Sequence, residues 1–307
     1  MKTKKYLTMV ATALMMVACS NEDVPLVDYA TNTPIRIHAM VAELESRAGI
    51  ASDDDFSQFY LNVENSSNGK YSYSNVSVSK SGSAWAPSTP MLWQNSASTV
   101  SVTGATFSLD GAQNLAVQTD QSTNANVIQS DHLYMTATSQ TYAAITDVKE
   151  AGAIYVNFSH IMSKVNLTIT LDGVFEGGAT NPISDVTFQG TVASRSYTSG
   201  TGWGTIPNNA SATDIKAYAG TYTAPTQEAP DATAQYEVIL VPQTIASGFA
   251  VQFKVGNRTF KWTSTNPVTL ESGKQYTLAL TAEDEVSGAS FSSTPWGNGG
   301  NSNVATE

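Results

Sequence analysis

Side chains that could carry out chemistry are few and scattered along this 307-residue chain. The histidines are His38, His132 and His160, and none has a second ligand-type residue at a metal-binding spacing such as HxxxH. The run from Ser52 to Phe56 (SDDDF) offers carboxylates as calcium ligands, but it lacks the spaced loop of an EF-hand. A solvated acidic loop or a helix cap is the other interpretation. Because no nucleophile, base and oxyanion donor can be assembled, we expect no catalytic residues, no metal site and no cofactor.

Two further features could bind a ligand. The stretch SGTGWGT around Gly200 looks like a phosphate loop, but it is followed by Ile206-Pro207 rather than a helix start, so the helix-dipole mechanism is absent. Tryptophans could stack on sugar rings if exposed, and core packing is the alternative, favoured for Trp262 because it alternates with Phe260. Trp203, flanked by glycines, is the one to test for exposure. The complete set is Trp85, Trp93, Trp203, Trp262 and Trp296.

Cys19 is the only cysteine, so it can form no internal disulfide and cannot build a cysteine-based metal site. It follows three lysines and an apolar stretch from Tyr6 to Ala18, which is typical of a secretory signal peptide and short for a membrane-spanning helix. Val17-Ala18-Cys19 resembles a bacterial lipobox, in which the thiol accepts diacylglycerol and becomes the first residue of the mature protein. The alternative is a secreted protein whose Cys19 leaves with the signal peptide, residues 1–18.

The segment after the cysteine and the overall charge both favour export. Ser20-Asn21-Glu22-Asp23 resembles the acidic surface-export signal of Bacteroidetes lipoproteins. The net charge is −11, and removal of residues 1–18 with their three lysines leaves −14. The 15 Lys and Arg residues are spread thinly, so we expect no nucleic-acid partner. These features predict a chain tethered by lipid to the outside of the outer membrane.

Alternation of apolar and polar residues with period two is the main structural signal. It is clearest from Val165 to Leu171, and Gly256-Asn257 is a two-residue hairpin signal that leads into RTFKWT. Tyr236 to Val241 is a continuous apolar run, typical of a strand buried on both faces. The only helix expected is short, around Asp55 to Val63, while SDHLYMTATS near Ser130 could adopt either structure. Further strands are expected in the segments IRIHAMV, NVSVS, STVSVTG, AIYVNF, FAVQFKV and YTLAL.

The phase of this alternation predicts a domain boundary. Apolar residues occupy even positions from Ile154 to Phe158 and odd positions from Val165 onward. A break between Ser159 and Ser163 explains the shift. We therefore expect an all-β chain of two tandem β-sandwich domains, transthyretin-like or Ig-like, with the first at residues 48–159 and the second at 160–307. His160 is then a structural histidine at the junction, and the Gly- and Asn-rich C-terminal end is a flexible tail.

A set of short segments, in order, spans nearly the whole chain: the lipobox at Cys19, IRIHAMV leading to SRAG, VNFSHIMSKVNLTI, ILVPQT, FAVQFKVGNRTFKWT, LESGKQYTLAL and PWGNGG. Together they resemble the fimbrillin-like lipoproteins of Bacteroidales, which are subunits of type V pili. The resemblance implies export as a lipoprotein and a cut by a trypsin-like, Arg-specific protease at Arg47-Ala48. An ordinary exposed loop arginine is the alternative for Arg47. Residues 19–47 would be a propeptide carrying the lipid and a removable strand with Ile35, Ile37, Ala39 and Val41 on one face.

The resemblance also implies assembly by strand exchange. The vacated groove would accept a strand from another pilus subunit by β-augmentation. The donor would lie in residues 286–307, where Ala289 and Phe291 could enter a groove. Pro295 and the glycine-rich tail make a poor strand, so a tip or accessory subunit is an alternative to a stalk subunit. A host or bacterial surface ligand is a further expected partner. The alternative function is an uncleaved surface lipoprotein that acts as an adhesin or glycan-binding module, and no enzymatic activity is expected.

Overall fold

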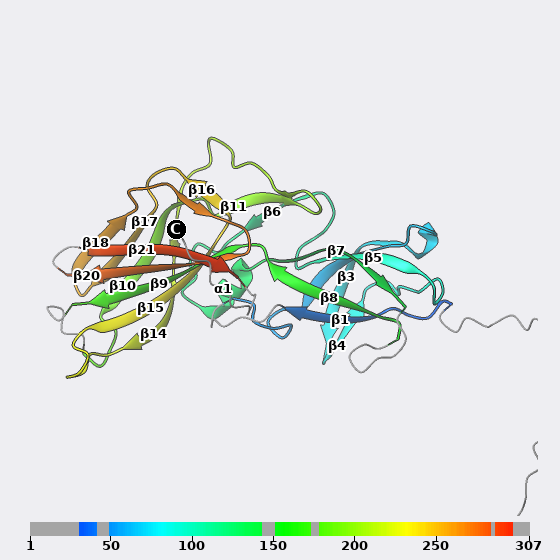
Figure 1. Cartoon of the computed structure of the whole chain (residues 1–307), viewed down its shortest axis with the longest axis horizontal. Coiled ribbons are helices and arrows are strands. Elements are labelled where there is room, and N and C mark those ends of the chain that lie inside the picture. Colours follow the sequence, from blue (N-terminus) through cyan, green and yellow to red (C-terminus); the bar gives the residue numbers. More distant parts are fainter. Residues whose placement is uncertain (1–30, 42–48, 143–150, 173–177, 284–285, 297–307) are drawn as a thin grey trace, which may run out of the picture.

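The structure is a computed structural model that describes residues 31–41, 49–142, 151–172, 178–283 and 286–296. Strands form nearly all of its regular structure, with one α-helix and one short 3-10 helix in these ranges. The molecule is elongated, with one group of strands at each end (Figure 1). The prediction of an all-β chain is confirmed.

The N-terminal body is built on one seven-stranded sheet. The sheet curls so that its two edge strands lie in contact, and it encloses a core in which Phe59, Trp93 and Phe158 are fully buried. A 3-10 helix, η1 (Gly69–Tyr71), precedes strand β3 (Tyr73–Ser81) in the chain. The strand order is β1 (Arg36–Val41), β8 (Ala153–His160), β7 (Leu133–Thr141), β5 (Thr99–Ala105), β2 (Gln58–Glu64), β3 (Tyr73–Ser81) and β4 (Ala84–Pro87).

The C-terminal body has a five-stranded and a four-stranded sheet that share one apolar core, which includes Leu167, Phe188 and Val251. The five-stranded order is β14 (Tyr218–Thr223), β15 (Ala232–Leu240), β9 (Ser163–Leu171), β20 (Lys274–Ala282) and β21 (Val286–Pro295). The four-stranded order is β13 (Thr213–Lys216), β10 (Ile183–Thr191), β17 (Ala250–Val255) and β18 (Arg258–Thr263). A separate pair is formed by β16 (Gln243–Ile245) and β19 (Val268–Leu270).

The chain between β5 and β7 packs on the C-terminal body. Strand β6 (Ala112–Ala116) pairs with β11 (Ser194–Thr198), which also pairs with β12 (Gly202–Trp203). The helix α1 (Asn124–Ser130) contacts β15. β8 ends at His160 and β9 begins at Ser163. The boundary between residues 159 and 160 remains a prediction, and the excursion of β6 and α1 links the two bodies across it.

The expected strands are present, and one expected helix is not. β9 carries the alternation from Val165 to Leu171, and β17 and β18 form the hairpin around Gly256, whose φ of 58° suits the turn. The prediction of a helix around Asp55 to Val63 is wrong, because Phe59, Leu61 and Val63 point into the core with the period of strand β2. Among the described residues, no helix is long and apolar enough to cross a membrane.

Candidate functional site

β1 is an edge strand with one apolar and one exposed face. Ile35, Ile37 and Ala39 are buried in the core of the N-terminal body, and Val41 packs against that core partly buried. Met40, on the opposite face, is 51% exposed. This alternation gives β1 the side-chain pattern predicted for the removable strand.

The ladder that holds β1 is parallel and one-sided. β1 pairs with β8 from Arg36 opposite Ala153 to Val41 opposite Phe158, and no other described strand pairs with it. The guanidinium of Arg36 also donates to the Ala151 carbonyl at 2.9 Å. The ring of His38 stacks on Tyr155 of β8, with centroids 5.1 Å apart. Because β1 is at the edge, the other six strands of the sheet would remain contiguous if it left.

The outer side of β1 borders a cleft of about 320 Å³ between β1 and β4. Its lining residues come from β1, from β4 and from the loop before β2: Ile35, Arg36, Ile37, His38, Ala39, Asp53, Ser83, Ala84 and Trp85. β1 and β4 touch across this cleft without forming a ladder. A strand edge that faces a cleft is a site where another strand can add.

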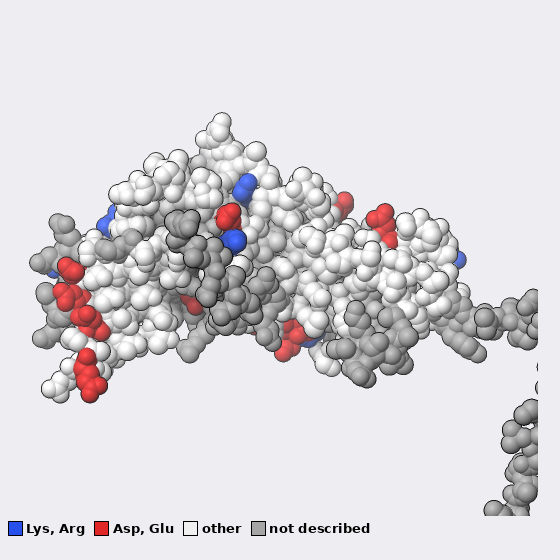
Figure 2. Space-filling view, viewed as in Figure 1, with Lys and Arg blue, Asp and Glu red and all other residues white. Residues whose placement is uncertain are grey.

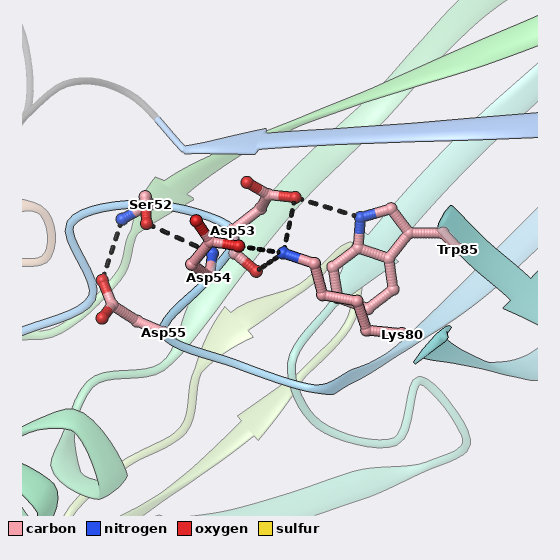
Figure 3. A network of polar contacts seen from close by, with 6 residues as sticks. All are labelled: Ser52, Asp53, Asp54, Asp55, Lys80 and Trp85. Atoms are coloured by element: carbon pink, nitrogen blue, oxygen red, sulfur yellow. Dashed lines mark hydrogen bonds and ion pairs between the residues drawn. The ribbon is translucent and has the colours of Figure 1, made fainter. Parts of the chain in front are cut away.

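The acidic loop predicted as a candidate calcium site contributes Asp53 to the lining of this cleft. Figure 3 shows the polar contacts of the loop. The ammonium of Lys80 lies 3.1 Å from Asp53 Oδ2 and 2.6 Å from Asp54 Oδ1, and the Trp85 indole N–H donates to Asp53 at 3.3 Å. Asp55 accepts from the backbone N–H of Ser52 at 3.0 Å. The hydrogen bond to Asp54 raises the pKa of Lys80 above 10.5, against the opposing effect of burial. The three carboxylates therefore have protein partners, and the described residues contain no cluster of three or more metal-ligand side chains.

β21, the proposed donor segment, is also an edge strand. It pairs antiparallel with β20 from Val286 opposite Ala282 to Pro295 opposite Lys274. Phe291 stacks on Tyr276, with ring centroids 5.1 Å apart, and Ala289 lies in the same strand. In this structure β21 is thus part of the five-stranded sheet of the C-terminal body.

A buried polar junction brings Gly49 and Ile50 together with Trp296, the last described residue. His160 Nδ1 lies 2.9 Å from Asp131 Oδ2, and the same carboxylate accepts from Ile50 N–H at 3.0 Å. The ring of Trp296 stacks on His160 at 4.1 Å, and Trp296 is 4% exposed. Gly49 has a φ of 102°, and a Cβ there would lie 3.0 Å from Asp131, so glycine suits both the turn and the space. The sequence placed His160 at a junction but gave no sign of Asp131 or Trp296 as its partners.

An ion pair between Lys164 and Glu237 lies beside this junction. Lys164 is buried and its ammonium lies 2.8 Å from Glu237 Oε2 and 6.0 Å from the ring centroid of Trp296. Burial lowers the pKa of Lys164, and the neighbouring Glu237 carboxylate opposes that shift. The pair fixes the end of β9 where it meets the C-terminal segment.

The remaining predicted residues are placed as follows. Trp203 is half-buried rather than exposed: it donates to Ser272 Oγ at 3.2 Å, packs edge-on against Tyr197, and has the Arg195 guanidinium 5.8 Å from its ring centroid. His132 Nε2 lies 3.1 Å from the Ala116 carbonyl, and burial lowers its pKa. On the face shown in Figure 2, basic residues are few and separated. Cys19, Arg47 and Ala48 lie outside the described residues.

Comparisons with known proteins agree with this architecture. The sequence model of the family described as fimbrillin-like matches residues 45–296. The crystal structure of a candidate cell adhesion protein from Bacteroides ovatus is similar, with a TM-score of 0.62 and 17% identity over 87% of this chain and 98% of that one. A candidate cell adhesion protein from Bacteroides uniformis has a TM-score of 0.55 and 14% identity over 86% of this chain and 98% of that one. At these identities the likeness shows a shared fold. A search of curated proteins gives no match. The family match covers most of the sequence, and the chain therefore belongs to the fimbrillin-like family.

Proposed function

We propose that this chain is a structural subunit of a surface pilus that is joined to other subunits by β-strand exchange. The observation that carries the proposal is the state of β1: a terminal edge strand, paired on one side with β8 and bordered on the other by a cleft. The role is structural and adhesive rather than catalytic. Membership of the fimbrillin-like family supports a place in a fimbrium at the cell surface.

The proposed cycle begins with export as a lipoprotein. Cys19 carries the lipid that holds the precursor in the outer membrane. A trypsin-like, Arg-specific protease cuts between Arg47 and Ala48, and residues 19–47 leave with the lipid and with β1. The bond follows β1 in the sequence, and protease nicks concentrate in exposed segments between elements of regular structure.

Removal of β1 supplies the driving force for assembly. The cut withdraws Ile35, Ile37 and Ala39 from the core and leaves the paired edge of β8 without a ladder partner. Exposed apolar surface and unpaired backbone groups are both unfavourable in water. A strand from a neighbouring subunit restores the ladder and fills the groove with alternate side chains.

The state of β21 favours a subunit that accepts a strand and donates one poorly. To become a donor, β21 would have to leave its ladder with β20, unstack Phe291 from Tyr276 and withdraw Trp296 from His160. We therefore assign the chain to the tip or to an accessory position of the pilus, with Ala289 and Phe291 as the donor residues if β21 detaches.

The test is the N-terminal sequence and lipid status of the protein taken from the cell surface. We expect it to begin at Ala48 without lipid and to appear in detergent-resistant ladders. Arg47→Ala should retain the lipid and abolish the ladders, whereas Arg258→Ala, which removes an arginine at an exposed position of β18, should leave them unchanged. Normal ladders from Arg47→Ala would refute the cycle. A mature protein that begins at lipidated Cys19 would establish the alternative, an uncleaved surface adhesin.

A further inference from the structure

β7 and β8 are neighbours in the sheet that separate soon after they leave the junction. Their pairing is confined to Leu133 opposite His160 and Tyr134 opposite Ser159. β7 also has an irregular register against β5 between Met135 and Thr138. A cavity of about 460 Å³ lies where the two strands diverge, within the range of roughly 300–1,000 Å³ that ligand sites occupy.

The backbone of β8 along this cavity already has partners. The side-chain amide of Gln140 accepts from Tyr155 N–H and donates to the Tyr155 carbonyl, both at 2.8 Å. Asn157 N–H lies 3.2 Å from Met135 Sδ. Gln140 thus takes the place of a ladder partner. A peptide strand would have to displace it, which disfavours β-augmentation here and leaves side chains as the recognition groups.

The walls of the cavity are uncharged and rich in hydroxyl and amide groups. Thr136, Ser139, Asn157 and Ser159 are exposed there, and within the described residues their side chains have no protein hydrogen-bond partner. Hydroxyl and amide groups both donate and accept hydrogen bonds. The complete lining is Tyr134, Met135, Thr136, Thr138, Ser139, Gln140, Tyr155, Asn157, Ser159, Ile161 and Tyr197.

Three tyrosines also line the cavity, together with the apolar side chains of Met135 and Ile161. Tyr134 and Tyr197 meet edge-on at 5.5 Å at the inner end, and Tyr155 is held in place by its stack on His38. Burial raises the pKa of Tyr197 to about 12, so its phenol stays neutral at ordinary pH. An aromatic face beside free hydroxyl and amide groups offers both an apolar surface and hydrogen bonds.

We infer that this cavity binds an uncharged oligosaccharide. A charged ligand would find no counter-charge in the lining, and an apolar ligand would leave the hydroxyl and amide groups without partners. Sugar hydroxyls match groups that donate and accept, and the apolar face of a sugar ring matches tyrosine. This site goes beyond the proposed role in assembly, and its lining does not include Trp203, the tryptophan that the sequence marked for a test of exposure.

The test measures binding of the purified, uncleaved full chain to immobilised uncharged oligosaccharides, with sialylated and sulfated oligosaccharides as charged competitors. We expect binding to one or more uncharged oligosaccharides that the charged ones do not compete away. Asn157→Ala and Ser159→Ala, both at exposed positions, should each weaken the affinity about 3- to 10-fold. Thr259→Ala, which removes an exposed hydroxyl on β18, is the matched control and should leave the affinity unchanged.

Three results would overturn the inference: no binding to any uncharged oligosaccharide, binding of charged ones alone, or affinity that is unchanged in the double variant Asn157→Ala, Ser159→Ala. Because the measurement uses the uncleaved chain, failure here leaves strand exchange untouched. Normal ladders from Arg47→Ala, which would refute the proposed assembly cycle, likewise leave oligosaccharide binding standing.

Discussion

β1 and β21 are both edge strands near an end of the chain, yet they are held in different ways. β1 has six residues, pairs in parallel with β8 and borders a cleft on its other side. β21 has ten residues, pairs antiparallel with β20 and is followed by Trp296 in the buried junction. An edge position alone therefore does not make a strand removable. β1 also has contacts of its own, because residues 32–35 form backbone hydrogen bonds with residues 91–93 and His38 stacks on Tyr155. The two strands therefore differ in length, in ladder direction and in the buried Trp296 that follows β21.

The largest loss of unfolding free energy is expected when Trp296, which follows β21, can no longer stack on His160. Trp296→Ala removes a buried indole stacked on His160, so we expect the free energy of unfolding to fall by about 3–5 kcal/mol in chemical denaturation. Pro295→Ala, at an exposed position, should change it by less than about 0.5 kcal/mol. A loss for Trp296→Ala no larger than that of the control would show that β21 is held by its ladder alone.

A smaller effect is expected from the core contacts of β1. Ile37→Ala should cost about 2–5 kcal/mol in the full chain, because it leaves a cavity beside β8. Met40→Ala, on the exposed face of the same strand, is the control and should be nearly neutral. The urea midpoint of Ile37→Ala should move from that of the full chain toward that of a chain that begins at Ala48. Equal midpoints for the full chain and the shortened chain would mean that β1 contributes nothing to stability.

A substitution in the buried junction should lower the free energy of unfolding equally in the chain with residues 19–47 and in the chain without them. Asp131→Asn weakens the acceptor shared by His160 and Ile50, and we expect a loss of about 1–3 kcal/mol. Because Ile50 remains after the proposed cut, the loss should be the same with and without residues 19–47. Hydrogen exchange at the Ile50 amide should accelerate in the variant. An unchanged exchange rate would show that Asp131 does not hold the Ile50 segment in place.

The smallest effect is expected at the rim of the β1 cleft. Lys80→Met removes the ion pairs to Asp53 and Asp54, which should cost about 0–1 kcal/mol at neutral pH. The pKa of Lys80 is raised in the folded chain, so its contribution is present below pH 10.5 and is lost as the pH rises through the raised value. Denaturation measured at pH 7 and again as the pH rises above 10.5 should therefore show that the stability difference between wild type and variant shrinks. A difference that grows with pH would contradict this assignment.

Local patterns were sufficient to predict many of the strands. The alternation in β9 and the Gly256-Asn257 turn between β17 and β18 depend on neighbouring residues, so sequence alone contains them. β2 was misassigned because the acidic run before it looks like the start of a helix, although Phe59, Leu61 and Val63 already alternate with the period of a strand.

The junction could not be predicted in the same way. Ile50, Asp131, His160 and Trp296 come from four distant segments, and no periodicity relates them. The excursion of β6 and α1 onto the C-terminal body is also a matter of long-range pairing, since Leu115 meets Arg195 across the chain. The strand β1 was found because its apolar pattern is local, whereas the cleft beside it depends on the curl of the whole sheet.

The parallel pairing of β1 also determines when this strand joins the fold. Arg36 bonds to Ala151, 115 positions later in the chain, and closing a loop of that length costs more entropy than pairing β2 with β3 or β5 with β7. We therefore expect β1 to dock last, on a body that has already formed. The species without β1 is then a folding intermediate of the precursor as well as the product of the proposed cut. The rate of β1 docking would then set how long a newly made chain exposes an open groove.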